Sequence, residues 1–208
     1  MLGDFAVLDT ETNWDNRVMS VGIVLADGID LTPTDTRYFV LTPEAEVGGM
    51  FSSALWLEST PALVRTREEA IREIREWLAA AEVESIFAYN ARFDWGMLPE
   101  LRDRRWYDIM GLAAYRQYND SIPPWADCCR SGRLRRGFGV EAILRLLRQD
   151  YYREEHNALR DALDELEIMR RLGHRPETYE RARVDREEQT GGQRKHPSDF
   201  AAYRLTEK

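Results

Sequence analysis

Three hydrophobic runs near the start of the chain have the length and composition of β-strands. They cover residues 5–10, 18–25 and 37–41, and all three are short and rich in branched or aromatic side chains. A turn sequence at residues 26–28 follows the second run, and Pro43 stops the third. The short connections predict an antiparallel meander of three strands.

Helical and strand-like patterns alternate along the rest of the chain. Apolar positions at helical spacing predict a helix over residues 66–81, and Thr66 followed by Glu69 forms the pattern of a capping box at its start. Residues 44–65 show no clear period, which predicts loop and short helix. The later segments are expected to be a strand, a helix, a short strand leading into a helix, a long polar loop and two helices, at residues 85–89, 94–104, 106–118, 119–139, 140–147 and 158–172.

This order, βββαβαβαα, predicts an α/β fold. Three meandering strands followed by strands that alternate with helices are typical of a five-stranded mixed sheet flanked by helices on both sides. A length of 208 residues and a hydrophobic share of 43% suit one domain of ordinary size, expected over residues 1–175. Residues 176–208 are highly charged and are expected to form a C-terminal tail that is helical in part.

Nothing in the sequence directs the protein to a membrane or to an oxidising compartment. No apolar run is long enough to span a bilayer, and the N-terminus lacks a basic stretch followed by a cleavage site. Cys128 and Cys129 are neighbours, so they cannot crosslink distant elements. We therefore expect a cytoplasmic protein with no membrane partner.

The net charge of −8 bears on the partners of the protein. Proteins that hold duplex nucleic acid by general electrostatics are normally basic, so this charge argues against a large non-specific duplex footprint. It does not exclude a phosphodiester-cleaving enzyme, because carboxylates clustered around cations raise the acidic count and the cations reverse the local sign.

Four acidic residues and one histidine occur at predicted ends of strands and helices. Asp9 and Glu11 lie two residues apart on the first strand, so both point to the same face. Asp94 follows a buried-type strand. Asp161 lies in the first turns of the last helix, with His156 in the loop before it. Taken singly, each has an ordinary explanation: solvated acids at a strand end, a helix N-cap, or a surface histidine.

Taken together, the five side chains match what phosphodiester hydrolysis requires at one edge of a sheet. Two divalent ions roughly 4 Å apart can activate a water and stabilise the leaving oxygen. Mg²⁺ and Mn²⁺ prefer the oxygen ligands that Asp and Glu supply. A histidine with a pKa near neutrality can accept the proton of the water.

The segments that carry these residues resemble the three exonuclease motifs of the DEDDh family. They are Asp9-Thr-Glu11-Thr, Asn90-Ala-Arg-Phe-Asp94 and His156-Asn-Ala-Leu-Arg-Asp161-Ala, in the order of that family and with plausible gaps. The family includes polymerase proofreading exonucleases, ribonuclease T and oligoribonuclease, and the resemblance covers roughly residues 4–172. It implies a ribonuclease H-like fold and 3′→5′ exonuclease activity.

The resemblance also implies a role for each site residue. Asp9, Glu11 and Asp161 would hold the first of two divalent metal ions, Mg²⁺ or Mn²⁺. Asp9 would bridge to the second ion, with Asp94 reaching it directly or through water. His156 would be the general base, and Glu11 would also lie near the 3′-terminal hydroxyl.

Two residues in or beside these motifs are candidates for contacts to the substrate. Trp14 could stack on the terminal base, a contact of about 1–3 kcal/mol, or pack half-buried against the protein. Asn90 could contact the terminal nucleotide or simply hold its turn. Departures from the family pattern at residues 13–14, 48–51 and 89 remove no ligand, but they bear on substrate preference.

Further acids follow Asp161 on the same predicted helix. They are Asp164, Glu165 and Glu167. The simplest interpretation of these three is a solvated helix face.

The leading hypothesis is an exonuclease that acts on the 3′ end of single-stranded RNA or DNA and releases nucleotide monophosphates. RNA is slightly favoured, because the compact chain resembles stand-alone exoribonucleases more than polymerase subunits. A ribonuclease H or integrase-like enzyme would share the carboxylates but would generally lack His156. A catalytically inactive scaffold or nucleic-acid-binding subunit would be expected to have lost a ligand, and a proofreading-type DNA exonuclease subunit stays compatible. Dimerisation is common among the compact relatives, so a homodimer is compatible as well.

Overall fold

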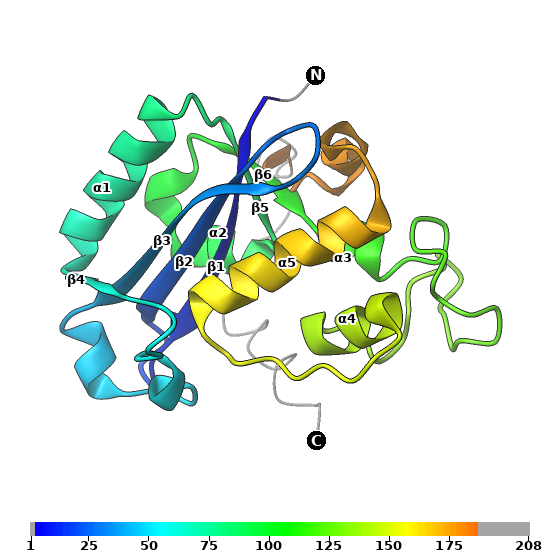
Figure 1. Cartoon of the computed structure of the whole chain (residues 1–208), viewed down its shortest axis with the longest axis horizontal. Coiled ribbons are helices and arrows are strands. Elements are labelled where there is room, and N and C mark those ends of the chain that lie inside the picture. Colours follow the sequence, from blue (N-terminus) through cyan, green and yellow to red (C-terminus); the bar gives the residue numbers. More distant parts are fainter. Residues whose placement is uncertain (1–2, 187–208) are drawn as a thin grey trace.

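Strand β1 (Phe5–Thr12) lies in the interior of the sheet and is buried along nearly its whole length. The computed structural model, which describes residues 3–186, places six strands in the order β4-β3-β2-β1-β5-β6 (Figure 1). β1, β2 and β3 form an antiparallel meander, whereas β5 and β6 run parallel to β1. The other strands are β2 (Val18–Ala26), β3 (Pro33–Leu41), β4 (Leu63–Arg65), β5 (Ser85–Ala88) and β6 (Arg105–Asp108).

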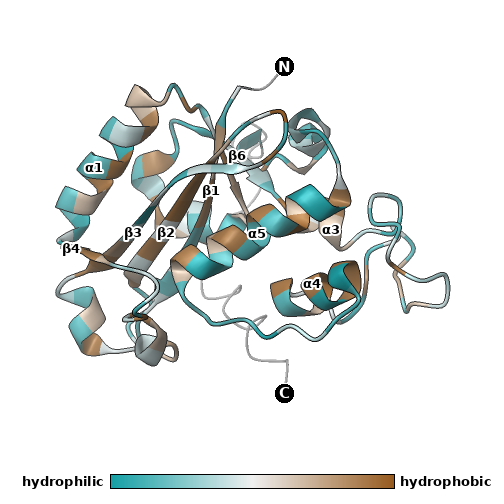
Figure 2. Ribbon diagram, viewed as in Figure 1, coloured by the Kyte–Doolittle hydropathy of each residue, from teal (hydrophilic) through white to brown (hydrophobic). Residues whose placement is uncertain are grey.

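Helices cover both faces of this sheet and enclose two hydrophobic cores. Phe5 and Val7 of β1 face the core under α5, whereas Ala6 and Leu8 face the core under α1, as the alternation of a strand requires. The strands in the middle of the sheet are hydrophobic along most of their length (Figure 2). The helices are α1 (Arg67–Ala80), α2 (Arg92–Met97), α3 (Met110–Ala113), α4 (Val140–Arg148) and α5 (Ala158–Leu172), with the 3₁₀ helices η1 (Glu44–Val47), η2 (Ser52–Ala54), η3 (Pro99–Leu101) and η4 (Pro176–Ala182).

The predicted α/β fold with a mixed sheet is confirmed, but the predicted count of five strands is wrong. The sixth strand, β4, adds to the edge of the sheet parallel to β3, with Leu63 opposite Phe39. It lies in the stretch predicted as loop and short helix. A strand of three residues is too short to show an alternating pattern, and its pairing with a distant segment defines it.

Local signals identified helix starts better than helix ends. The capping box at Thr66 is present: its side chain accepts the backbone N–H of Glu69, and the Glu69 carboxylate accepts the backbone N–H of Thr66. The helix predicted to reach about residue 118 ends at Ala113 instead. The backbone carbonyl of Ala114 accepts a hydrogen bond from the N–H of Leu134, so the chain there pairs with the long loop rather than continuing a helix.

The described part of the expected tail packs on the sheet. η4 contacts β6 and α3, and Tyr179 within it is fully buried. Residues 187–208, the remainder of the expected tail, lie outside the described residues. Within residues 3–186, no helix has the length and apolar character needed to cross a membrane.

The first residues of α5 pack directly against Gly22 on β2. A Cβ atom at this position would lie 2.2 Å from backbone atoms of Ala158 and Leu159, the first residues of α5. Only a residue without a side chain lets the two backbones approach this closely. Because Gly22 pairs with Asp9 across the strands, this contact sets the height of α5 above the acidic end of β1.

Gly22→Ala is therefore expected to destabilise the protein by at least about 1–3 kcal/mol, the usual cost of overpacking a core, because backbone must move to admit the methyl group. Gly96→Ala is the matched control: Gly96 lies in α2, and no atom lies within 4 Å of the Cβ position there. Alanine is favoured over glycine in a helix by up to about 1 kcal/mol, so this control should be neutral or stabilising. Urea unfolding measures both changes, and a Gly22→Ala variant as stable as the wild type would contradict the close approach of α5.

Candidate active site

The carboxyl ends of β1, β5 and β6 meet at one edge of the sheet, because these three strands are parallel. In open α/β sheets, ligands bind outside this edge. β1 carries Asp9 and Glu11 toward its end, and Asn90 and Asp94 follow β5. The edge therefore gathers polar residues from segments far apart in the sequence.

Asp9 and Glu11 point into the interior on the face covered by α5. They continue the alternation of Phe5 and Val7, which belong to the core under that helix. Both acids are buried. Two buried carboxylates on one strand face are costly unless protons, hydrogen bonds or cations compensate their charge.

The start of α5 holds Asp161 above these two acids. Asn157 caps the helix: its side chain accepts the N–H of Arg160 and donates to the carbonyl of Ala54 at 2.7 Å, which ties α5 to η2. Asp161 lies in the first turn and is buried. The cap and the contact at Gly22 together position its carboxylate.

His156 precedes this cap in a left-handed backbone conformation, with a φ angle of 55°. This conformation costs a non-glycine residue about 1–3 kcal/mol and is frequent at functional sites. The ring of His156 stacks on Phe51, with 4.0 Å between the ring centroids and 21° between the planes. The loop around η2 thus holds the imidazole from one side.

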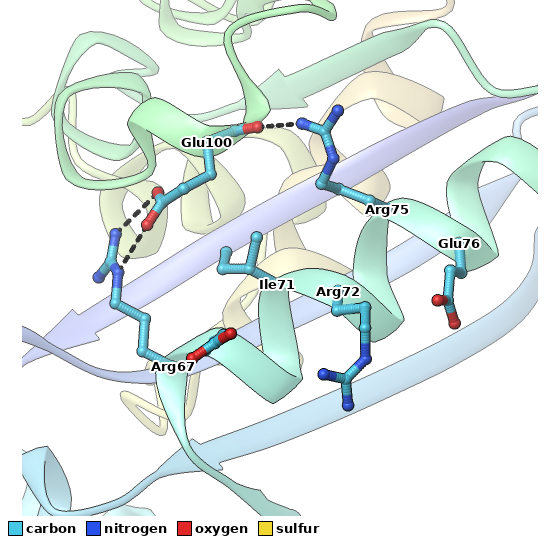
Figure 3. A pocket seen from close by; sticks show the side chains of 7 residues that line it. Arg67, Ile71, Arg72, Arg75, Glu76 and Glu100 are labelled. Carbon is cyan, nitrogen blue, oxygen red and sulfur yellow. Dashed lines mark hydrogen bonds and ion pairs between the residues drawn. The ribbon is translucent and has the colours of Figure 1, made fainter.

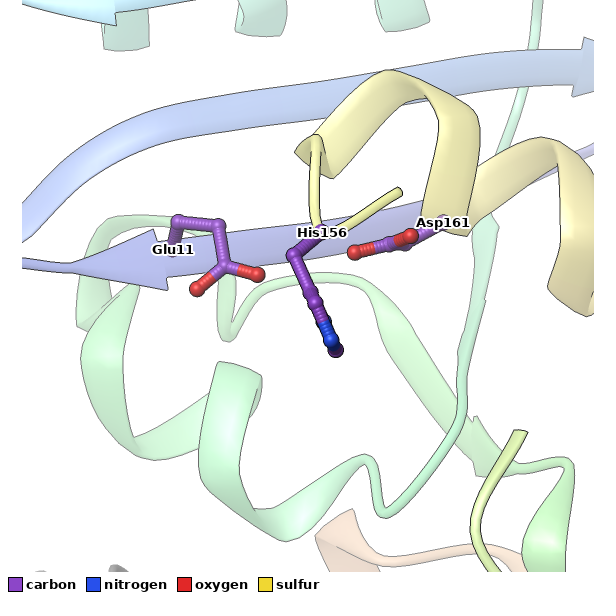
Figure 4. A group of neighbouring side chains, drawn as sticks. All are labelled: Glu11, His156 and Asp161. Atoms are coloured by element: carbon purple, nitrogen blue, oxygen red, sulfur yellow. The ribbon is translucent and has the colours of Figure 1, made fainter. Parts of the chain in front are cut away.

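These elements bring three predicted site residues into one cluster. Glu11, His156 and Asp161 each offer a ligand atom, and the three atoms lie within 4.8 Å of one another. Figure 4 shows the imidazole between the two carboxylates, which come from β1 and α5. Such a spacing would let the two carboxylates hold one cation with the imidazole close beside it.

Asp94 reaches the same edge from α2. Its Oδ1 accepts a hydrogen bond of 2.7 Å from the hydroxyl of Thr10, the residue between the two acids of β1, and its carboxylate is buried. Asp94 is not the N-cap of its helix, because the N-cap position belongs to Ala91. The ordinary explanation of this acid as a helix cap is therefore excluded.

The electrostatics of the site are those of crowded acids. Burial, and then the neighbouring carboxylate of Asp9, raise the pKa of Asp161 well above its ordinary value. Burial and then Asp9 and Asp94 likewise raise the pKa of Glu165, while a hydrogen bond with the backbone of Tyr89 opposes the shift. Without bound cations, the carboxyl groups of Asp161 and Glu165 therefore keep their protons to a higher pH than free carboxyl groups do.

The acids after Asp161 were predicted to form a solvated helix face, and for Glu165 this prediction is wrong. Only 1% of this residue is exposed. It lies four residues after Asp161, so the two side chains share one side of α5, and that spacing was the signal in the sequence. Asp164 is half-buried beside the hydroxyl of Tyr152, which donates to it, and Glu167 forms ion pairs nearer the surface.

The two predicted substrate contacts, Trp14 and Asn90, follow the carboxyl ends of β1 and β5. Trp14 is 67% exposed, so it does not pack half-buried, and its backbone N–H donates to the carbonyl of Gly48. Asn90 has a φ angle of 59°, and its N–H donates to Oδ1 of Asp108 at 3.0 Å. Burial raises the pKa of Asp108 to about 6, although backbone N–H groups, including that of Met110, oppose the shift.

A separate groove lies on the surface of α1, and it is not part of the acidic cluster. It measures about 650 Å³, and Arg67, Arg75 and Glu100 line it together with other α1 residues (Figure 3). Both arginines bond to Glu100, through its carboxylate and its carbonyl. None of the predicted site residues lines this groove.

Comparison with known proteins identifies the fold. No protein-family model matches the chain, and no curated protein matches it. A full-length 3′-exonuclease has a similar structure, with a TM-score of 0.59 and 15% identity over 82% of this chain and 81% of that one. The nuclease domain of 3′hExo, described as a DEDDh family member bound to rAMP, gives a TM-score of 0.58 and 16% identity over 82% of this chain and 92% of that one.

The chain has the fold of the DEDDh-type 3′-exonucleases. A zinc-bound complex of E. coli ExoI with ssDNA shares this exonuclease fold, with a TM-score of 0.58 and 13% identity over 87% of this chain. The chain spans only 42% of that longer protein. The ribonuclease H-like fold expected from the sequence is thereby confirmed.

Asp161→Asn is expected to stabilise the metal-free protein. The folded-state pKa of Asp161 is raised, so the folded protein holds more protons than the unfolded chain above about pH 4, and stability falls as pH rises through this window. The gain from Asp161→Asn should therefore be small near pH 4 and grow toward neutrality, at about 2–4 °C of melting temperature for each kcal/mol.

Thermal melts in EDTA across this pH range measure the effect. Asp103→Asn, at a half-exposed acid paired with Arg75, is the control and should show no such growth. A lower melting temperature for Asp161→Asn at neutral pH would contradict the crowding of acids.

Proposed function

We propose that the chain is a metal-dependent 3′→5′ exonuclease that removes nucleotide monophosphates from single-stranded nucleic acid. The observation that carries the proposal is the cluster of Glu11, His156 and Asp161 within 4.8 Å, at the edge that Asp9 and Asp94 also reach. The solved structures of similar fold are exonucleases, which supports the same reaction class.

The acids at this edge fit divalent cations. Oδ1 of Asp161 and Oε2 of Glu165 are buried, and no hydrogen-bond donor within residues 3–186 reaches either atom. The charges that act most strongly on Asp161 are all carboxylates. Buried oxygens of this kind match the ligand preference of Mg²⁺ and Mn²⁺.

The proposal gives each predicted ligand a role. Asp9, Glu11 and Asp161 would hold one ion, and Asp9 would bridge to a second ion on the side of Asp94. When bound, such ions stabilise the negative charge that develops on the phosphate and on the leaving oxygen. Glu11 would also lie near the 3′-terminal hydroxyl.

His156 acts as the general base. An imidazole nitrogen accepts a proton from the attacking water as the water oxygen bonds to phosphorus. The bond between phosphorus and the 3′-oxygen of the preceding nucleotide breaks, a nucleoside 5′-monophosphate leaves, and the freed 3′-oxygen takes a proton from solvent to become the new 3′-hydroxyl. The half-exposed ring can then pass its proton to solvent, and its stacking on Phe51 limits the orientations open to it.

Single strands are the proposed substrate. Trp14 follows β1 and is largely exposed, so an unpaired base could stack on it, and Asn90 follows the neighbouring parallel strand β5 at the same edge of the sheet. Structures of similar fold are complexes with rAMP and with ssDNA, so both sugars are accepted among them. RNA stays slightly favoured for this chain, and a cytoplasmic location and a homodimer remain predictions of the sequence.

Asp9→Asn and His156→Ala are each expected to lower exonuclease activity by about 10³-fold or more, because one removes a cation ligand and the other the base. The assay follows 5′-labelled single-stranded RNA and DNA of matched sequence with Mg²⁺, Mn²⁺ or EDTA. The wild type should shorten both from the 3′ end only when a metal is present, with RNA degraded faster.

His174→Ala is the matched control for the base. His174 bonds to the carbonyl of Tyr118, away from the cluster, so this variant should keep its activity. Intact substrate under every metal condition, with binding retained, would indicate a non-catalytic nucleic-acid-binding or scaffold protein. Faster digestion of DNA would instead favour a proofreading-type enzyme.

Trp14→Ala should weaken the binding of a single-stranded 3′ end by about 5- to 150-fold, the range that corresponds to 1–3 kcal/mol of stacking. The rate at saturating substrate should change far less. Ile29→Ala is the control: Ile29 is 86% exposed on the β2–β3 hairpin, at the opposite end of the sheet. Equal KM values for the wild type and Trp14→Ala would exclude stacking by this side chain.

A further inference from the structure

We propose that Glu165 is an additional carboxylate of the cation site, facing the ion on the side of Asp94. The proposal rests on the proposed function, because it concerns the same divalent cations. No motif in the sequence assigns this residue a role. Its position follows from the packing of α5 on β1 and β2.

Glu165 lies in the interior between α5 and the sheet. Only 1% of it is exposed, and it follows Asp161 by about one helical turn. The backbone of Tyr89, directly after β5, forms a hydrogen bond with its carboxylate. Its Oε2 is buried, and no donor in the described part of the chain reaches that atom.

Both α5 acids belong to one group of interacting carboxylates. The carboxylate that acts most strongly on each of them is Asp9. Asp94 comes next for Glu165, whereas Glu154 and then Glu11 come next for Asp161. A cation beside Glu165 would compensate its repulsion by Asp9 and Asp94.

A purely structural role does not account for a carboxylate at this position. The residues around it on the inner face of α5 are apolar, including Ala162, Leu166 and Met169. A glutamine could keep the hydrogen bond with the backbone of Tyr89 without the cost of burying a charge among three other acids. An oxygen ligand that holds a cation, directly or through water, does account for it.

Calorimetric titration with Mn²⁺, without nucleic acid, distinguishes a cation ligand from a purely structural residue. Glu165→Gln keeps the shape and removes the charge, and Glu165→Leu removes both oxygens. We expect Mn²⁺ to bind about 10–100-fold more weakly to one of two sites in Glu165→Gln, and more weakly still in Glu165→Leu. Glu167→Gln, on the same helix but nearer the surface, is the matched control and should bind as the wild type does.

Thermal melts in EDTA supply the second readout. Glu165→Gln should melt above the wild type, because it relieves repulsion among buried acids and keeps an oxygen for the hydrogen bond with the backbone of Tyr89. Wild-type Mn²⁺ affinity in either folded variant would overturn the role of Glu165 and leave the exonuclease proposal standing. A wild-type protein that binds no Mn²⁺ would overturn both.

Discussion

The close contact between α5 and the sheet at Gly22 determines the geometry of the whole candidate site. Because the backbone of α5 rests on β2 at this point, the helix begins directly above the acidic end of β1. Asp161 then faces Asp9, and Glu165 lies a turn further on toward β5. The same contact fixes Asn157, whose side chain joins α5 to η2 and so brings His156 against Phe51.

This geometry concentrates negative charge where water is largely excluded. The acids come from β1, α2 and α5, and burial raises the pKa values of those on α5. A hydrophobic interior would be more stable with apolar residues at these positions. Buried acids at one edge of a sheet, together with left-handed backbone at Asn90 and His156, are features that the proposed function explains.

Much of this arrangement could be predicted from local patterns in the sequence. The spacing of Asp9 and Glu11 places them on one strand face, and the apolar period of residues 158–172 identifies α5. Features that depend on contacts between distant segments could not be predicted. β4 is a strand only because β3 pairs with it, and the exposure of Trp14 depends on the contact of its loop with Gly48.

Glu165 illustrates the difference most clearly. Its spacing of four residues from Asp161 was visible in the sequence, but an acid on a helix is usually solvated. Whether such a side chain faces water or the interior depends on the roll of the helix about its axis. In this protein the apolar residues Ala162, Leu166 and Met169 mark the inner face of α5, and the tertiary contact at Gly22 brings that face close to the acids of β1.

A crystal structure of the wild-type protein with Mn²⁺ and a nucleoside 5′-monophosphate, with anomalous scattering to locate the metal, tests the central claim most directly. The account predicts Mn²⁺ among the oxygens of Asp9, Glu11 and Asp161, a second Mn²⁺ on the side of Asp94, and the phosphate beside His156. Mn²⁺ absent from these carboxylates at millimolar concentration, or a nucleotide bound elsewhere on the surface, would contradict it.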